Sequence, residues 1–356
     1  MSTYLRNAGR VTFALAAVAF LLSLAPAAAA TSPNAYRVTP LVSDNGVPGT
    51  AVDANLTNAW GLVAGPATPW WVSDNGADMS TLYNGTGVKV AAIHPTVASA
   101  PTGVVFNGNA TSFPVGTANS AARLIFATES GTILGWTIGF TAAEVKVNRS
   151  AAGAIYKGLA IAPTAAGPLL FATDFHNGRV DVVNRTWALV TVPGGFTDPS
   201  LPAGYAPFGI QTIGDRIFVT FAKQGSGADE VDGQSLGFVD AFDVNGHLLA
   251  RVAQRGVLNA PWGLAWAPED FGAFSGDLLV GNFGDGHINA FHEMADGRFV
   301  FQGALRTFGG EKLAIDGLWA LEFGHGTANN GPTNALFFTA GPNDEADGLF
   351  GTITAG

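Results

Sequence analysis

The chain contains no cysteine, few charged residues and, after its first 30 residues, no long hydrophobic run. Without cysteine it forms no disulfide bonds, no Cys-ligated metal site and no thiol nucleophile, so the fold must depend on packing. Charged residues make up only 12% of the 356 residues, whereas 47 residues are glycine. Long amphipathic helical patterns are also missing, and we expect only short helical pieces such as residues 141–146. This composition favours many short strands joined by tight turns.

The first 30 residues have the features of an export signal. Arg6 and Arg10 precede an apolar run of about 15 residues, which is shorter than a membrane span, and an Ala-rich segment follows. We expect cleavage after Ala30 and a mature protein, residues 31–356, that is secreted or periplasmic. An uncleaved N-terminal anchor is the alternative. No later stretch has the length and hydropathy of a membrane span.

The mature chain is acidic. Without Arg6 and Arg10, 15 basic residues remain against 27 acidic residues, a formal net charge of −12. Such a surface repels phosphate groups, and no Lys/Arg cluster interrupts it, which argues against nucleic acid and anionic membranes as partners.

One short apolar phrase occurs six times. It reads NAWGLV at 58–63 and APWGLAWAP at 260–268, and its other copies are APTGVV, YKGLAIA, APFGIQ and DGLWALE. The central Gly (Ala320 in the last copy) recurs after 42, 55, 51, 54 and 57 residues. This is the spacing of propeller blades with four strands and variable loops. Further strand-like segments follow each copy, so we predict an all-β, six-bladed β-propeller in one domain, residues 31–356.

The sixth repeat ends one strand short, whereas the segment 35–44 precedes the first repeat without a partner. Pairing of the two would close the ring and remove exposed sheet edges, so we predict that the N-terminal strand completes the last blade. An open solenoid is the alternative. In the closed ring, the Gly of each phrase permits close approach of neighbouring strands, and Trp60, Trp262 and Trp319 pack between blades. Ligand stacking is the alternative role of these tryptophans.

These phrases make the chain similar to NHL-type six-bladed propellers. More closely, it resembles a family of exported bacterial propeller proteins, through segments such as VTPLVSDN, VSDNGADMSTLYNG, DGLWALEFG and AGPNDEADGLFG. The resemblance implies the fold and export but carries no activity over. Where that family has a Lys-rich acidic loop and a later His, this chain reads KQGSGADEV at 223–231 and has Asp347.

Polar residues occur where each first strand begins and each second strand ends. Antiparallel pairing puts these two positions on one face of the disc. We therefore predict a ligand-binding site at one mouth of the channel, formed by Asp74, Asn75, Glu129, Lys157, Asp174, Lys223, Asn282, Asp316 and Asp344. The alternative is that Asp and Asn here only cap turns, while Lys157 and Lys223 neutralise acidic neighbours.

Four of these residues end second strands, and we predict that they are metal ligands: Asp74, Glu129, Asp174 and Asn282. Carboxylate and amide oxygens suit Ca²⁺ or Mg²⁺. The pattern also resembles the metal centre of lactonase-type propellers, which take acidic and Asn ligands from several blades. Such an ion would polarise a substrate carbonyl and activate a water molecule.

Three classes of function follow. The first is an exported monomer that binds a small polar molecule, a glycan or a partner protein at the channel mouth. The second is a hydrolase or lactonase that depends on Ca²⁺ or Mg²⁺ at the same site. The third is a structural protein of the envelope or matrix. Bound metal separates the first two, because only the enzyme requires it, and the fold alone does not choose among them.

Overall fold

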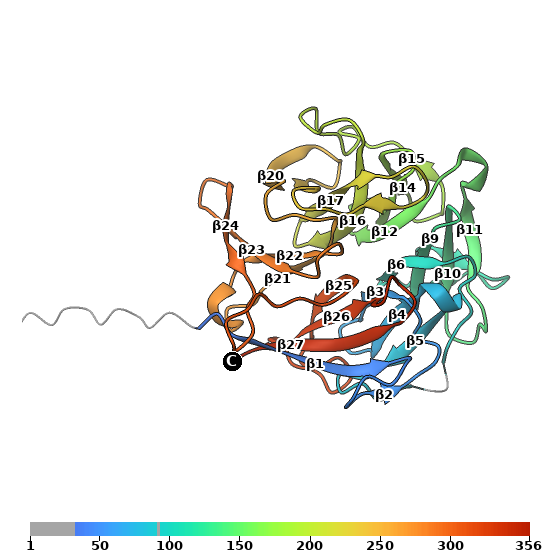
Figure 1. Cartoon of the computed structure of the whole chain (residues 1–356). Helices are drawn as coiled ribbons and strands as arrows, with labels where there is room; N and C mark the ends of the chain where they lie inside the picture. The colour runs from blue at the N-terminus through green and yellow to red at the C-terminus, as the bar shows by residue number, and fades with distance from the viewer. Residues whose placement is uncertain (1–32, 91–92) are drawn as a thin grey trace, which may run out of the picture. The chain divides into compact units, whose positions relative to one another are not determined.

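Six sheets surround a common axis in the computed structural model, which describes residues 33–90 and 93–356 (Figure 1). The predicted six-bladed β-propeller is therefore confirmed. The predicted export signal, residues 1–30, lies outside the described residues. Within the described ranges, no helix combines the length and hydropathy required to cross a membrane.

The innermost strand of each blade carries the repeated phrase. These strands are β3 (Ala59–Val63), β6 (Pro101–Phe106), β12 (Tyr156–Ala162), β16 (Tyr205–Ile213), β21 (Pro261–Trp266) and β25 (Leu318–Phe323). Each inner strand contacts the next one, and β25 contacts β3, so the six strands form a closed ring.

The second and third strands of each blade follow outward in antiparallel order. The second strands are β4 (Trp70–Asp74), β9 (Leu124–Thr128), β13 (Leu169–Asp174), β17 (Arg216–Gln224), β22 (Leu278–Asn282) and β26 (Leu336–Ala340). The third strands are β5 (Met79–Tyr83), β10 (Thr132–Trp136), β14 (Arg179–Val183), β19 (Phe238–Phe242), β23 (Ile288–Glu293) and β27 (Leu349–Ala355).

Five blades have a fourth, outer strand, and the first blade has three strands within the described residues. The outer strands are β11 (Glu144–Asn148), β15 (Leu189–Val190), β20 (Leu248–Gln254), β24 (Phe299–Ala304) and β1 (Tyr36–Ser43). The predicted helical piece at 141–146 is wrong, because β11 begins within it. Val145 and Val147 are β-branched residues, which favour strands, and Val147 is buried.

The N-terminal strand completes the last blade, as predicted. Strand β1 pairs with β27 in antiparallel register from Tyr36↔Ala355 to Ser43↔Leu349. Tyr36 is buried, stacks on Phe274 and donates a hydrogen bond from Oη to the carbonyl of Phe271, at 3.0 Å. The sheet edge that β27 would otherwise expose is thereby covered.

The glycines of the phrase lie where neighbouring inner strands approach each other most closely. A Cβ at Gly61 would lie 2.3 Å from the carbonyl oxygen of Thr102, and one at Gly209 would lie 2.2 Å from that of Trp262. These distances are too short for any side chain. The predicted reason for glycine at these positions is therefore confirmed.

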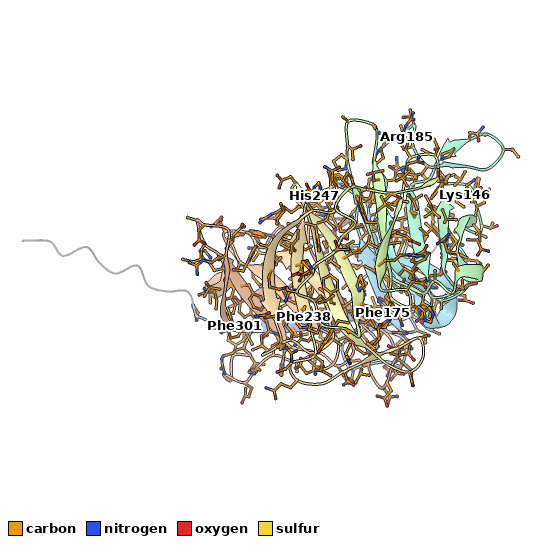
Figure 2. The ribbon with its side chains drawn as sticks, turned by 90° about the horizontal axis from the view of Figure 1, so that it is seen from above. Lys146, Phe175, Arg185, Phe238, His247 and Phe301 are labelled. Carbon is orange, nitrogen blue, oxygen red and sulfur yellow. The ribbon has the colours of Figure 1, made fainter. Side chains whose placement is uncertain are left out.

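Side chains fill the space within and between the blades (Figure 2). Phe175 and Phe238 are buried, whereas Phe301 on the outer strand β24 is exposed. The core is therefore distributed over the blades.

Candidate functional site

A register shift recurs in the ladder between the first and second strands of every blade, at the repeated phrase. A β-bulge of this kind re-aims a side chain. The side chains just before the phrase Gly or Ala320 are Trp60, Thr102, Lys157, Phe208, Trp262 and Trp319. Four of these are aromatic and meet one another, as the following distances show.

Trp319 is the centre of an aromatic cluster. Its ring lies 3.7 Å from the ring of Trp60, 4.1 Å from Phe283, and 5.9 Å from both Trp262 and Phe208. We call these five side chains the aromatic plug. The three tryptophans are therefore packing residues, and they contact one another across blades one, five and six.

A buried lysine lies beside this plug. Lys157 is only 1% exposed, and its Nζ lies 5.0 Å from the ring centre of Trp60. The ammonium donates hydrogen bonds to Glu129 Oε1 at 2.7 Å and to Asp229 Oδ1 at 3.4 Å. A buried ammonium needs such partners, because burial without them would favour its neutral form.

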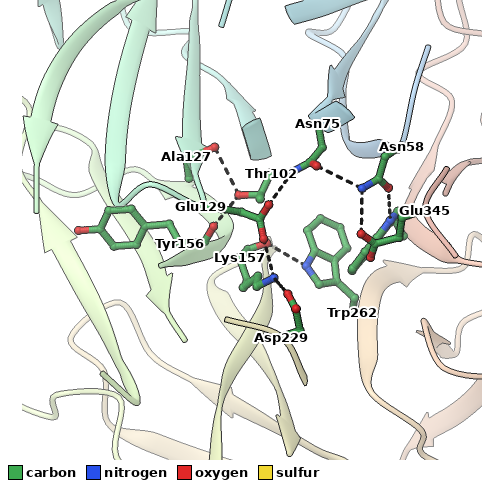
Figure 3. A network of polar contacts seen from close by, with 11 residues as sticks. Asn58, Asn75, Thr102, Ala127, Glu129, Tyr156, Lys157, Asp229, Trp262 and Glu345 are labelled. Atoms are coloured by element: carbon green, nitrogen blue, oxygen red, sulfur yellow. Dashed lines mark hydrogen bonds and ion pairs between the residues drawn. The ribbon is translucent and has the colours of Figure 1, made fainter. Parts of the chain in front are cut away.

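A chain of hydrogen bonds continues from Glu129 (Figure 3). Asn75 Nδ2 donates to Glu129 Oε2 at 3.2 Å, and Asn58 Nδ2 donates to Asn75 Oδ1 at 3.2 Å. Asn58 Nδ2 also donates to Glu345 Oε2 at 3.1 Å, while its Oδ1 accepts from Trp319 Nε1 at 3.0 Å. The polar layer is therefore bonded directly to the aromatic plug.

Two loops bring the remaining acidic groups to this layer. The hairpin between β17 and the short strand β18 (Glu230–Val231) contributes Asp229 and Glu230. The second loop contributes Glu345, which with Asn343 and Asp344 has φ between 51° and 65°. Three consecutive left-handed residues are sterically costly, and such strain concentrates at functional sites. We call the group Asn58, Asn75, Glu129, Lys157, Asp229, Glu230 and Glu345 the acid mouth.

Negative charge exceeds positive charge in the acid mouth, since four carboxyl groups share one ammonium. Burial disfavours the charged Lys157, but Glu129, Glu230 and Asp229 outweigh burial, so the lysine pKa lies above its ordinary value. Burial, together with Asp229 and Glu129, raises the pKa of Glu230 although Lys157 opposes the change. Burial and then repulsion by Glu230 raise the pKa of Glu345 to about 7. Among the described residues, Glu230 Oε2 has no hydrogen-bond partner.

The structure brings together three of the nine predicted ligand-binding residues, namely Asn75, Glu129 and Lys157. Lys223 Nζ instead lies over the ring of Tyr205, 5.3 Å from its centre. Asp316 Oδ2 accepts a hydrogen bond from the backbone N–H of Asn343 at 2.9 Å, and the side chain of Asp344 is exposed. These two support or flank the second loop and do not join the hydrogen-bonded network.

Asp74, Asp174 and Asn282 are bonded within their own blades. Asp174 accepts from Asn177 Nδ2 at 2.8 Å and lies 3.2 Å from an Arg179 nitrogen. Asp74 Oδ1 accepts from Thr81 at 3.1 Å, and burial raises the pKa of Asp74 well above its usual value. Asn282 Nδ2 donates to the carbonyl of Val257 at 2.8 Å and to Asp285 at 3.0 Å. The contacts of these three residues therefore agree with the alternative interpretation, in which Asp and Asn at the strand ends only stabilise turns and local packing.

The assumption that Glu129 lies level with Asp74, Asp174 and Asn282 is wrong. In the ladders, Asp74 pairs with Ala59 and Asn282 with Pro261, but the residue paired with the equivalent Pro101 is Thr128. Glu129 is therefore one position further along. Successive side chains of a strand point to opposite sides, so a shift of one residue separates Glu129 from the other three.

Backbone hydrogen bonds show the true equivalents of Glu129. The N–H groups of Asn75, Glu129, Phe175, Phe283 and Gly341 each donate to the carbonyl three residues before the phrase Gly or Ala320. Two of these five positions are aromatic and one is glycine. Only Asn75 and Glu129 therefore bring polar side chains to this level.

The residues present do not fit the predicted metal centre. The four proposed ligands do not converge, and the described part of the chain contains no group of three or more His, Asp or Glu side chains placed to hold an ion. At the acid mouth, the Lys157 ammonium lies among the carboxylates. Binding of Ca²⁺ or Mg²⁺ stays a prediction, without a ligand set in this geometry.

Sequence reasoning did not select Asn58, Asp229, Glu230 and Glu345. Asn58 is the first residue of the first phrase, and the two acidic loops are the segments noted through the family resemblance, KQGSGADEV and AGPNDEADGLFG. The sequence of these two loops therefore indicated that they could belong to the site. It did not indicate which acidic residue of each loop joins the hydrogen-bonded network.

Replacement of Glu345 by Gln should flatten the pH dependence of stability. A carboxyl whose folded pKa is raised stabilises the fold below its unfolded pKa and loses that contribution as pH rises through the folded value, here about 7. Between pH 4.5 and 7 this contribution amounts to up to about 3 kcal/mol. Urea unfolding at pH 5 and pH 8 checks the prediction, and equal pH slopes in wild type and Glu345→Gln would contradict it.

The fold and the site together define a six-bladed β-propeller with a mouth rich in carboxyl and amide groups. The chain is 31% identical over 336 residues to uncharacterized protein R648 of Acanthamoeba polyphaga mimivirus, covering 89% of this chain and 80% of the relative. It is 30% identical to uncharacterized protein L690 of the same virus, over 89% of this chain and 85% of the relative. The chain belongs to the family of these proteins. No protein-family model matches it.

Solved structures support the fold at low sequence identity. A protein of unknown function from Bacteroides thetaiotaomicron matches with a TM-score of 0.57 and 11% identity over 90% of this chain and 76% of that chain. A glucose dehydrogenase matches with a TM-score of 0.54 and 14% identity over 90% and 100%, and a streptogramin B lyase with 0.51 and 11% over 90% and 98%. The two sequence relatives are viral and give no support to a bacterial origin or to export.

Proposed function

We propose that this protein is an exported propeller that binds a small polar ligand bearing a positive charge at the acid mouth. The observation that carries the proposal is the excess of carboxyl groups around Lys157, with a buried Glu230 oxygen that no described residue satisfies. Burial and then repulsion by neighbouring carboxyl groups raise the pKa of Glu345, and a cationic ligand would relieve the repulsion. Export with cleavage after Ala30 rests on the sequence of residues 1–30. Recovery of the protein in the cytoplasm would contradict export, and an intact Met1 on secreted material would contradict cleavage.

The composition of the site favours a small molecule among the ligands that the sequence left open. Asn58 and Asn75 supply amide groups beside the carboxylates, so hydroxyl and ammonium groups of one ligand would both find partners. Protonated amines and amino sugars combine these groups. A neutral glycan would not relieve the excess negative charge, and a protein partner would have to present a basic side chain here.

Glucosamine should bind more tightly than glucose, and Glu129→Gln should weaken glucosamine binding at least tenfold, about 1.4 kcal/mol. The reason is that this substitution removes a carboxylate that pairs with Lys157 but keeps the shape of the side chain. Isothermal titration of both proteins with glucosamine, spermidine and glucose is the measurement. Asp174→Asn is the matched control, because Asp174 is bonded within its blade, and its binding should equal that of wild type.

The proposal would be contradicted if neither glucosamine nor spermidine binds the wild-type protein and Glu129→Gln only lowers its stability. The alternative of a metal-dependent hydrolase or lactonase is tested in the same instrument with Ca²⁺ and Mg²⁺, beside a lactone hydrolysis assay. A saturable heat with either ion would favour that alternative. The dehydrogenase and lyase among the similar structures support only the fold, at 14% and 11% identity.

A further inference from the structure

A pocket opens at the ends of the inner strands that lie away from the acid mouth. It has a volume of about 160 Å³ and is lined mainly by apolar side chains, among them Ala64, Val104 and Ile161. Lys157 and Asn58 lie at the starts of β12 and β3, whereas Ile161 and Ala64 lie at or beyond their ends. We call this cavity the far pocket, because the length of the inner strands separates it from the acid mouth.

The aromatic plug closes the channel between the two. Trp60 and Trp319 stack at 3.7 Å, and the cavity next to the plug, lined by Gly61, Gly103 and Trp262, has a volume of only about 20 Å³. This is room for roughly one water molecule. A molecule in the far pocket therefore has no route to the acid mouth, and the far pocket is a separate site.

Three polar residues also line the far pocket: Gln211, Thr212 and Glu322. Thr212 Oγ1 is buried, and no described residue forms a hydrogen bond with it. Glu322 is mostly buried, and its Oε1 lies 3.3 Å from His325 Nε2. A buried hydroxyl without a partner destabilises a fold, so a ligand that satisfies it gains affinity.

The size and chemistry of the cavity select a class of ligand. An engineered apolar cavity of about 150 Å³ is known to hold benzene, so a volume of about 160 Å³ accommodates one six-membered ring. Apolar pockets with a few convergent polar groups are the usual form of small-molecule sites. We propose that the far pocket binds a single-ring apolar molecule carrying a protonated amine, with the ring against Val104 and Ile161 and the amine at Glu322 and Thr212.

Benzylamine is the test ligand, and titration of the full mature chain at pH 7.5 is the measurement, with benzyl alcohol and benzoate beside it. We expect saturable binding in the order benzylamine, benzyl alcohol, benzoate. Ala64→Leu adds three carbon atoms to the wall of the pocket and should reduce benzylamine binding at least tenfold. Thr212→Val has the same shape without the hydroxyl and should weaken binding several-fold while the melting temperature stays equal or rises.

Thr212→Val keeps the test decisive if Ala64→Leu fails to fold. Absence of saturable benzylamine binding to wild type would overturn the proposal. So would binding that both substitutions leave unchanged, because the amine would then occupy another site. Loss of benzylamine binding in Glu129→Gln would assign it to the acid mouth and would equally overturn the proposal, without deciding whether the acid mouth binds glucosamine.

Discussion

Deletion of residues 35–44 should leave a protein that aggregates or unfolds at room temperature. The deletion removes β1, which pairs with β27 along its length and buries Tyr36 and Val42 against the last blade. The last blade would then have three strands and an exposed edge, which is a template for association. Since folded domains are stable by only about 5 to 15 kcal/mol, loss of a whole strand removes a large part of that margin.

A rescue variant makes this experiment specific. The N–H of Gly356 donates to the carbonyl of Ala35 at 2.8 Å, so the end of β27 lies beside the start of β1. Moving residues 35–44 to the C-terminus behind a two-residue Asn-Gly turn should rebuild the same antiparallel pair as a hairpin. Size-exclusion chromatography and thermal melting compare the three proteins. An unchanged melting temperature in the deletion variant, or no recovery in the rescued one, would contradict the role of β1.

The fold was predictable because the glycine of the repeated phrase marks the place where the backbones of two neighbouring inner strands approach each other closely. A Cβ at Gly209 would lie 2.2 Å from the carbonyl oxygen of Trp262, so no other residue fits there, and glycine recurs at the equivalent position in five of the six blades. The missing last strand and the unpartnered segment 35–44 were equally visible, since each lacks a neighbour along the chain. The six-bladed, closed architecture was therefore predictable from local sequence patterns.

The candidate site was predictable only in part, because sequence similarity between blades hides a shift. FATE at 126–129 and FATD at 171–174 look equivalent, but Phe126 pairs one residue after the phrase Gly and so does Ala172. The offset of one residue is present on both sides of the bulge, because Pro101 pairs with Thr128 whereas the equivalent Tyr156 pairs with Asp174. Period-two alternation then places Glu129 at the mouth and Asp174 inside its blade.

The inward position of the acidic side chains in the two loops could not be predicted from the sequence, for a different reason. Glu230 and Glu345 come from blades four and six, and their inward position depends on Lys157 from blade three and Asn58 from blade one. Such contacts are set by the closed ring and not by neighbouring residues. The sequence therefore indicated that the loops matter but not which side chains lie in the network.

Replacement of Lys157 by Met should be the most destabilising point substitution at the acid mouth, by about 3 to 5 kcal/mol near pH 8. Removal of one partner from a buried ion pair leaves the opposite charge without compensation, and this effect has that size. The side chain of Lys157 is only 2% exposed, and four carboxyl groups surround its ammonium. Met keeps most of the volume, so loss of packing contributes little.

Lys146→Met is the matched control (Figure 2). Lys146 also pairs with a glutamate, Glu144, at 3.1 Å, but that pair lies on the outer strand β11 and is partly exposed. Exposed ion pairs contribute about 0 to 1 kcal/mol. The two substitutions remove the same charge from the same residue type, so the difference between them measures what burial among the carboxyl groups adds.

The pH dependence distinguishes electrostatics from packing at Lys157. Without the ammonium, the pKa values of Glu230 and Glu345 should rise further above those of the unfolded chain, because Lys157 lowers both. The folded variant then binds more protons than the unfolded chain, so its free energy of unfolding falls as pH rises. We expect the deficit relative to wild type to be smaller at pH 5 than at pH 8 by at least 1 kcal/mol, about 0.7 pKa units at one site. Urea unfolding at the two pH values is the measurement, and a deficit that is the same at both would mean that Lys157 acts through packing and that the acid mouth holds no excess negative charge for a ligand to neutralise.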